Sequence, residues 1–322
     1  MSWLLTGGAG YIGAHVALAL RGSGRDVVVL DDLSTGSVDR LPPDLPLVHA
    51  SVLDGTAVRE AMRRHRVTGV VHLAAKKAVA ESVAEPLRYY QENVEGFRTL
   101  LQAMCDEGVD QIVFSSSAAV YGMPDVDLVT EDTPPQPINP YGETKLIGEW
   151  LLRDAGVAHH IRWISLRYFN VAGAGDDSLA DKGANNLIPM VFRALDRGGA
   201  PQVFGDDYPT PDGSCVRDYI HVADLADAHV AAAGWLDRGA TSGIYNVGRG
   251  EGASVKEVLA VVRAVTGRDV EPQVVDRRPG DPARLVASAA AIERDLGWEA
   301  QRDLRDMVRT AWLGWRARSG DG

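Results

Sequence analysis

Three spaced glycines that follow a short apolar stretch constrain the fold of this chain more than any other feature. Residues 2–6 predict a buried strand, glycines stand at positions 7, 10 and 13, and a helical pattern begins directly after the second of them. Strand, glycine turn and helix in this order are typical of the first unit of a doubly wound parallel sheet. Gly7 permits the tight turn, Gly10 lets a ligand approach the backbone, and Gly13 lets the helix pack against the strand. The free amides at the helix start predict a site for the pyrophosphate of a dinucleotide.

Two carboxylates end the next predicted strand. That strand covers residues 26–30, and Asp31 and Asp32 follow it directly. A carboxylate at this position can accept hydrogen bonds from the adenosine ribose of a dinucleotide. Because its charge repels a 2′-phosphate, the sequence predicts NAD rather than NADP. A glycine turn and a surface carboxylate could also simply end a βα unit, but here strand, loop, helix, strand and acid stand in the order that a dinucleotide site requires.

The first half of the chain alternates between strand and helix patterns. We therefore predict an α/β fold in which helices cover a doubly wound parallel sheet, the Rossmann arrangement. The predicted strands cover residues 2–6, 26–30, 46–50, 69–73, 111–115 and 161–167, and the predicted helices cover residues 11–21, 54–65, 87–107 and 140–154. Beyond Asn170 the sequence becomes rich in Gly, Asp, Asn and Pro. We predict a NAD-binding domain over residues 1–169, to which residues 216–247 return, and a smaller, mixed α/β substrate lobe over residues 170–322.

The composition favours an enzyme that acts on small molecules in the cytoplasm. The formal net charge of −11 and the sequence pI of about 5.2 argue against nucleic acids and anionic membranes as partners. No apolar run approaches the ~20 residues of a membrane span, and no secretory signal precedes the first strand. The two cysteines, Cys105 and Cys215, lack metal-ligand spacing, so we predict no metal site.

Tyr141 and Lys145 stand four residues apart where a helical pattern begins. Side chains at this spacing share one face of a helix. An ammonium group near a phenol stabilises the phenolate, so we expect the pKa of Tyr141 to lie well below its ordinary value of about 10. The pair is therefore suited to taking a proton from an alcohol. The same residues also fit an ordinary amphipathic helix start, with Pro140 at its first position.

Three serines, Ser115 to Ser117, follow the apolar part of the strand predicted over residues 111–115. Ligands of doubly wound sheets bind at the carboxyl ends of the strands. Ser117 stands 24 residues before Tyr141, and its hydroxyl could bridge a substrate oxygen and the phenol. Ser115 and Ser116 fit a turn or a cap equally well. We therefore place Ser117 in the catalytic set with Tyr141 and Lys145.

Five stretches of the sequence together resemble one protein family. They are Gly-Gly-Ala-Gly-Tyr-Ile-Gly (7–13), Ser-Ser-Ser-Ala-Ala-Val-Tyr-Gly (115–122), Tyr-Gly-Glu-Thr-Lys (141–145), Leu-Arg-Tyr-Phe-Asn (166–170) and Val-Arg-Asp-Tyr-Ile-His-Val (216–222). In these stretches the chain is similar to the extended short-chain dehydrogenase/reductases. Within that family it resembles the UDP-glucose 4-epimerase branch at residues 77–83, 185–189 and 205–210 as well, and the likeness extends from Leu4 to the region of Trp298.

The resemblance implies an isomerase that interconverts UDP-glucose and UDP-galactose with NAD as the cofactor. Tyr141, kept as phenolate by Lys145 and the nicotinamide charge, would remove the proton of the sugar 4-hydroxyl directly or through Ser117. Hydride would pass from C4 to NAD and return to the opposite face of the 4-keto sugar. The resemblance also implies a homodimer joined through the helices near residues 87–107 and 140–154, although core packing explains the apolar positions of those helices equally well.

The resemblance assigns residues to two binding sites. The NAD site would include Gly7, Gly10, Tyr11, Ile12, Gly13, Asp31, Asp32, Ser51, Val52, Leu73, Ala74, Ala75, Lys77, Asn93, Ser115, Tyr141, Lys145 and Phe169. The UDP-sugar site would include Lys77, Ser117, Tyr141, Asn170, Asn186, Leu187, Gln202, Val203, Phe204, Arg217, Arg278, Asp281 and Leu285. In the second site Arg217 and Arg278 would supply guanidinium groups for the diphosphate, and Asp281 would accept from the uridine ribose.

Three positions depart from the family pattern. Ser51 replaces an aspartate that usually contacts the adenine amino group, and Ala119 replaces a common threonine. Leu285 stands seven residues after Arg278, where a tyrosine accompanies restriction to glucose and galactose and a small residue accompanies acceptance of N-acetyl sugars. Because leucine is intermediate in size, we expect UDP-glucose and UDP-galactose as the main pair, with some turnover of UDP-N-acetylhexosamines.

Other functions share parts of this pattern. A sugar-nucleotide 4,6-dehydratase would need an Asp-Glu pair for acid/base work where Ala118 and Ala119 stand. Epimerases of uronic acids or pentoses differ in pocket shape rather than in motif, so they stay open. A catalytically inactive NAD sensor would need only the glycine loop and Asp31, and the presence of Ser117 and Tyr141 argues against it.

Overall fold

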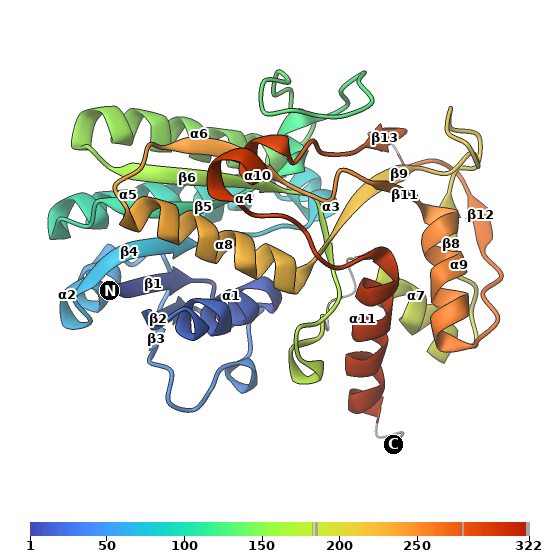
Figure 1. The fold of residues 1–322 in the computed structure, drawn as a ribbon, viewed down its shortest axis with the longest axis horizontal. Helices are drawn as coiled ribbons and strands as arrows, with labels where there is room; N and C mark the ends of the chain where they lie inside the picture. Colours follow the sequence, from blue (N-terminus) through green and yellow to red (C-terminus); the bar gives the residue numbers. More distant parts are fainter. Residues whose placement is uncertain (182, 184–185, 279, 320–322) are drawn as a thin grey trace.

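Seven parallel strands form the central sheet of the protein (Figure 1). The computed structural model describes residues 1–181, 183, 186–278 and 280–319. Across the sheet the strands are β3 (Leu47–His49), β2 (Asp26–Asp31), β1 (Ser2–Thr6), β4 (Val67–His72), β5 (Gln111–Ser117), β6 (Arg162–Tyr168) and β10 (Gly243–Val247). All neighbouring pairs are parallel, so the predicted doubly wound Rossmann sheet is confirmed. The strand order reverses between β1 and β4, which opens a ligand crevice at their carboxyl ends.

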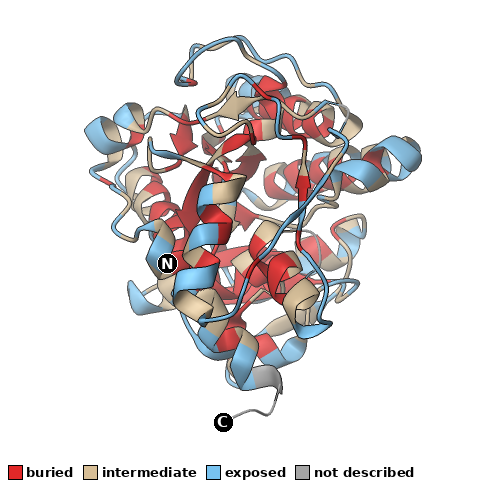
Figure 2. Ribbon diagram, turned by 90° about the vertical axis from the view of Figure 1, so that its right-hand side faces the viewer, coloured by how far each residue is buried: buried red, intermediate tan, exposed pale blue. Residues whose placement is uncertain are grey.

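Helices cover both faces of this sheet. One face carries α1 (Tyr11–Gly22), α8 (Val222–Asp237) and α10 (Ala290–Leu296), and the other carries α2 (Gly55–Arg64), α5 (Gly96–Glu107) and α6 (Pro140–His159). Side chains of β1 alternate between the two cores, because Trp3 and Leu5 pack on the first face and Leu4 on the second. Figure 2 shows the buried residues gathered on the strands and on the inward sides of the helices.

One predicted helix is interrupted. The stretch predicted as a single helix over residues 87–107 consists of α4 (Pro86–Tyr89), a π-helical segment η2 (Tyr90–Glu95) and α5. The prediction of one regular helix is therefore wrong in this part. The π-helical turns carry Asn93, whose side-chain amide bonds the backbone of Lys76 on both sides, and such local widening often accompanies functional sites. The other short helices are η1 (Val38–Arg40), α3 (Val79–Ala84), η3 (Ala118–Tyr121) and η4 (Asp177–Leu179).

The second part of the molecule is smaller and mixed α/β, as predicted (Figure 1). Its strands are β7 (Asn170–Ala172), β9 (Val216–His221), β11 (Gly252–Ser254) and β13 (Arg284–Leu285) in one sheet, and β8 (Gln202–Phe204) and β12 (Gln273–Val275) in another. Its helices are α7 (Leu187–Asp196), α9 (Val255–Thr266) and α11 (Leu304–Ser319). Phe192, Val258 and Met307, one from each helix, share a core that is separate from the cores of the central sheet.

Residues 216–247 contribute to both parts of the molecule. β9 belongs to the smaller sheet, where it pairs with β7, whereas α8 packs beside α1 and β10 extends the central sheet next to β6. The chain therefore passes between the two parts more than once, and a domain boundary at residue 169 stays a prediction. Within the part of the chain that the structure describes, no helix is long and apolar enough to cross a membrane.

Three buried histidines predict a loss of stability in mild acid. Burial lowers the pKa of His72 to about 3 and the pKa of His221 and of His229 to about 4. Below pH ~6.5 the unfolded chain binds protons at these rings while the folded chain does not, so stability is present above that pH and falls toward pH 4. We expect the free energy of unfolding to drop by about 1.4 kcal/mol per pH unit for each histidine.

Urea unfolding followed by circular dichroism at pH 7, 6 and 5 measures this slope. His229 offers the matched variant, because its Nε2 is buried and meets no hydrogen-bond partner among the described residues. His229→Leu is expected to reduce the dependence of the unfolding free energy on pH by the contribution of one histidine, about 1.4 kcal/mol per pH unit. An unchanged slope in this variant would contradict the assignment.

Candidate active site

The first cavity lies at the carboxyl ends of β1, β2 and β4 and has a volume of about 650 Å³. Gly7 forms its floor with a φ of +73°, and a Cβ there would stand 2.7 Å from the backbone nitrogen of Ala74. A Cβ on Gly13 would stand 2.1 Å from the carbonyl oxygen of Gly7, so the helix can approach the loop only at a glycine. The loop runs directly into the N-terminus of α1, where free amides favour an anion.

The wall of this cavity contains most of the residues predicted for NAD. They are Gly7, Gly10, Tyr11, Ile12, Gly13, Asp31, Asp32, Ser51, Val52, Leu73, Ala74, Ala75, Lys77, Ser115, Tyr141 and Lys145. Each oxygen of Asp31 accepts one backbone N–H, from Ala9 at 2.9 Å and from Leu33 at 2.8 Å, and burial raises the pKa of this carboxyl. The carboxylate is thereby oriented at the end of β2. The cavity size, the glycine cradle and this carboxylate together fit a dinucleotide.

Asn93 and Phe169 are the predicted NAD residues that lie outside the wall of this cavity, as far as the structure describes it. The amide nitrogen of Asn93 donates to the carbonyl of Lys76 at 2.9 Å and to the hydroxyl of Thr144 at 3.1 Å. Asn93 therefore joins the loop segment that follows β4 to α6 and supports the wall of the cavity. Phe169 is buried in an apolar cluster that includes Ala118 and Leu146.

The N-terminal turn of α6 carries Tyr141 and Lys145. Pro140 occupies the first turn of the helix, and the side chain of Asn139 caps it by accepting from the Gly142 N–H at 2.9 Å. The Lys145 ammonium is buried, donates to the Ser115 carbonyl at 2.8 Å and lies 5.9 Å from the ring centroid of Tyr141. The predicted placement of both side chains on one helix face is thus present in the structure.

The electrostatics of this pair differ from the expectation. Burial raises the pKa of Tyr141, and the hydrogen bond with Ser117 lowers it by less. Burial also lowers the pKa of Lys145 to about 7. The expectation of a phenol pKa well below 10 is therefore wrong for the chain by itself. The reason is desolvation, since both charged forms lose water in a site that the chain encloses.

The second cavity has a volume of about 520 Å³ and lies in the smaller part of the molecule. Of the predicted UDP-sugar residues, its wall contains Asn170, Asn186, Leu187, Gln202, Val203, Phe204, Arg217, Arg278 and Asp281. Arg217 donates to the carbonyl of Pro282 at 2.7 Å and forms an ion pair with Asp281 at 3.3 Å. The guanidinium of Arg278 lies over the ring of Phe204, 3.6 Å from its centroid. The guanidinium groups of Arg217 and Arg278 and the ring of Phe204 thus belong to the wall of one cavity.

The two cavities adjoin. Tyr11 and Asp181 belong to the walls of both, and the phenol of Tyr11 donates to the carbonyl of Gly173 at 2.6 Å. Lys77 and Tyr141 lie in the wall of the first cavity, on the other side of these shared residues from the second.

Two predicted substrate residues, Ser117 and Leu285, lie outside the walls of both cavities within the described part of the chain. The Ser117 hydroxyl lies near Tyr141, where it lowers the pKa of the phenol, and it accepts from the Ala119 N–H at 3.2 Å. Leu285 pairs with Arg217 across β13 and β9 and packs against the apolar cluster of Phe169. Leu285 thus supports β9, the strand that carries Arg217. Its side chain packs on the cluster that includes Ala118, the residue after Ser117.

A buried ion pair fixes α6 to the strands beneath it. Glu149, two turns after Tyr141, binds the Arg167 guanidinium through both carboxylate oxygens at 2.8 and 2.6 Å. Both side chains are nearly inaccessible, at 3% and 4% exposure. Ser116 donates to the same carboxylate at 2.6 Å, and Arg167 lies over the ring of Tyr121. This network holds α6 against the ends of β5 and β6 and thereby positions Tyr141.

Tyr168 is a site residue that the sequence reading did not identify. It lies in the wall of the first cavity, its phenol contacts the hydroxyl of Ser115, and burial raises its pKa. A signal was present, because Tyr168 ends β6 directly beside Ser117 of β5. Residues that end adjacent parallel strands meet at the ligand edge of the sheet.

Comparison with known proteins extends these observations. The sequence profile of the NAD dependent epimerase/dehydratase family matches residues 3–248. A UDP-glucose 4-epimerase of Azospirillum brasilense is 48% identical over 317 residues, which are 97% of this chain and 91% of that protein.

Solved structures agree with the sequence comparison. The UDP-glucose-4-epimerase of Stenotrophomonas maltophila, crystallised with bound NAD and formylated UDP-arabinopyranose, has a TM-score of 0.95 at 40% identity and covers 100% of both chains. The UDP-glucose 4-epimerase of Bifidobacterium longum in complex with NAD+ and UDP has a TM-score of 0.91 at 37% identity and also covers 100% of both chains. The likeness therefore includes residues 249–322, which the family profile does not reach.

Proposed function

Because this chain belongs to the NAD-dependent epimerase/dehydratase family, we propose that it interconverts UDP-glucose and UDP-galactose by inverting C4 of the sugar. One observation carries the proposal: a cavity that fits a dinucleotide and contains Tyr141 and Lys145 in its wall adjoins a second cavity, whose wall includes Arg217 and Arg278. The names of the similar proteins support the same reaction. We assign Tyr141, Lys145 and Ser117 to catalysis and the residues of the two walls to NAD and UDP-sugar.

The chain supplies the proton chemistry of this reaction. The Ser117 hydroxyl lies near the Tyr141 phenol and lowers its pKa, so the proton of the sugar 4-hydroxyl can reach the phenolate directly or through Ser117. Lys145 donates to the Ser115 carbonyl and keeps its ammonium next to the phenol ring. NAD, bound in the first cavity, supplies the hydride acceptor and donor for C4 and a positive nicotinamide charge that favours the phenolate. Ala118 and Ala119 offer no acid for loss of water, which separates this site from a dehydratase.

The test is a conversion assay with UDP-galactose and the purified protein, first without and then with added NAD, followed by anion-exchange chromatography. The appearance of UDP-glucose would support 4-epimerisation, and conversion without added cofactor would mean that NAD stays bound through purification. No conversion in either case would contradict the proposal and would direct attention to uronic-acid and pentose nucleotides.

Leu285 is the position at which we expect the sugar range to change. Because a smaller residue there frees space beside Phe169, Leu285→Ala is expected to raise the kcat/KM for UDP-N-acetylgalactosamine relative to UDP-galactose by about tenfold. Leu285→Met, which keeps the volume, is expected to leave that ratio within about threefold. Parallel kinetic measurements on both sugars check this, and equal ratios in all three proteins would show that another residue limits the sugar.

We further propose that the protein works in the cytoplasm as a homodimer joined through α5 and α6. Trp150 of α6 is 48% exposed, which is high for a large aromatic side chain. Light scattering at micromolar concentration should give twice the chain mass of 34.6 kDa, and a monomer would contradict the dimer.

A further inference from the structure

The segment Gly173–Gly175 connects the two binding sites. It follows β7, which carries Asn170, and precedes the loop that leads to Asn186 and α7. Gly173 lies in the wall of the second cavity, directly behind Tyr11, which lies in the walls of both. Its φ is +90°, and a Cβ there would stand 2.6 Å from the Nε2 of His221. The backbone of this short segment therefore sets the position of the second cavity relative to the glycine loop of the first.

Helix α1 binds the segment from the dinucleotide side. Besides the bond from the Tyr11 phenol to the Gly173 carbonyl, the N–H of Gly175 donates to Nε2 of His15 at 2.9 Å. A backbone N–H can only donate, so this ring nitrogen carries a lone pair. The other nitrogen, Nδ1, then carries the proton and donates to the Tyr11 carbonyl at 2.8 Å. His15 is consequently a neutral ring, and burial lowers its pKa.

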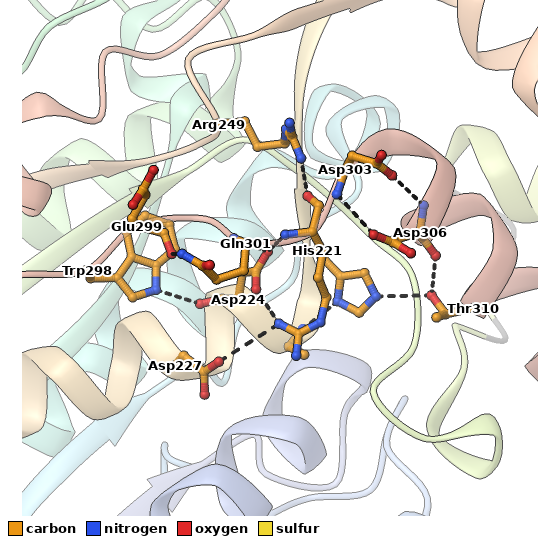
Figure 3. A network of polar contacts seen from close by, with 12 residues as sticks. His221, Asp224, Asp227, Arg249, Trp298, Glu299, Gln301, Asp303, Asp306 and Thr310 are labelled. Atoms are coloured by element: carbon orange, nitrogen blue, oxygen red, sulfur yellow. Dashed lines mark hydrogen bonds and ion pairs between the residues drawn. The ribbon is translucent and has the colours of Figure 1, made fainter.

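Helix α11 binds the segment from the opposite side. The hydroxyl of Thr310 accepts from the N–H of Ala174 at 3.1 Å and donates to the Asp306 carbonyl at 2.8 Å. His221 donates to the same hydroxyl through Nε2 at 3.0 Å, because its Nδ1 accepts from the Ala223 N–H (Figure 3). His221 is also in register with Ala172, the last residue of β7.

Asp224 fixes the start of α11 against α8. Its buried carboxylate accepts from the backbone N–H groups of Gln301 and Arg302, at 3.2 and 2.9 Å, and from the Arg302 guanidinium. Its carbonyl accepts from the indole of Trp298 at 3.0 Å (Figure 3). Thr310 therefore stands on a helix whose position is set by several buried bonds. This helix lies outside residues 3–248, so the contact comes from a part of the chain that the family profile does not include.

We propose that His15 and Thr310 are positioning residues that hold Gly173–Gly175 between α1 and α11 and so fix the nucleotide-sugar side of the site against the dinucleotide loop. The proposal rests on the function proposed above. Neither residue touches the reacting atoms. Both act through the backbone of the segment, because each accepts a hydrogen bond from one of its N–H groups. Without these acceptors, the chain between Asn170 and Asn186 would be less firmly held. Their loss should therefore weaken substrate binding more than it slows the chemical step.

The variants are His15→Leu and Thr310→Val, which remove the acceptors while keeping most of the volume. We expect each to raise the KM for UDP-galactose and the Kd for UDP by about tenfold, with a change in kcat below about threefold. His15→Gln and Thr310→Ser retain an acceptor and are expected to stay within about threefold of the unaltered protein. Bound NAD, measured after denaturation, should be equal in all five proteins.

Hydrogen exchange of the Ala174 and Gly175 amides gives a readout that needs no substrate. We expect both amides to be protected in the unaltered protein, with faster exchange at Ala174 in Thr310→Val and at Gly175 in His15→Leu. Unchanged UDP affinity together with unchanged exchange would overturn the proposal. Failure of the unaltered protein to bind UDP would contradict the proposed function instead, and the exchange rates would still decide whether the two residues hold the segment.

Discussion

Tyr141→Phe is expected to lower kcat for UDP-galactose by about 10³-fold, in the middle of the range that a positioned acid/base group contributes. The change removes one oxygen and keeps the ring, so binding of UDP and of NAD should be almost unaffected. The phenol is the group that Ser117 contacts, and no other hydroxyl of comparable acidity is proposed for the proton step. Initial rates with UDP-galactose and calorimetric titration with UDP measure the two effects separately.

Tyr245→Phe is the matched control. Tyr245 lies on β10, at the edge of the central sheet, and its phenol donates to Asp295 at 3.3 Å. The same single-atom change at this position should leave kcat unaltered. A Tyr141→Phe protein that keeps more than about a tenth of the original kcat would contradict the assignment of Tyr141 as the base.

The largest effect on stability is expected at Glu149. Glu149→Gln keeps the shape of the side chain but leaves the Arg167 guanidinium buried without its counter-charge. Removing one partner of such a pair costs about 3–5 kcal/mol, and more than half of the stability of an ordinary domain can be lost in this way. Urea unfolding followed by tryptophan fluorescence measures the change in the free energy of unfolding.

Glu95→Gln serves as the control for this experiment. Glu95 pairs with Arg98 one turn away on the surface, where both side chains are about half exposed, and exposed pairs contribute little. Its unfolding midpoint should therefore match that of the unaltered protein. If Glu149→Gln unfolds at the same urea concentration as this control, the buried pair does not hold α6 on the sheet.

Local patterns were sufficient to predict much of this molecule. The strand, glycine loop and helix of residues 2–22 follow from spacing alone, because Gly7 and Gly13 meet backbone atoms at distances that only glycine allows. Tyr141 and Lys145 were placed correctly on one helix face for the same reason, since a four-residue spacing fixes neighbours on a helix.

Properties that depend on distant residues were not predictable. Asn93, within the π-helical turns, bonds Lys76, 17 positions away in sequence, and the raised pKa of Tyr141 arises from burial in the folded chain. His15 and Gly175 are 160 positions apart in sequence, so no pattern near either residue indicates their bond.

The fate of the hydrogen on C4 distinguishes hydride transfer and return from a route in which a base removes that hydrogen as a proton. UDP-galactose that carries deuterium at C4 should be turned over in ordinary water, and the UDP-glucose formed should be analysed by mass spectrometry and NMR. If hydride leaves C4 and returns to the same carbon inside the closed site, the product keeps its deuterium at C4, and the unlabelled substrate takes up none from heavy water. Loss of the label to solvent would contradict the role assigned to NAD and to Tyr141.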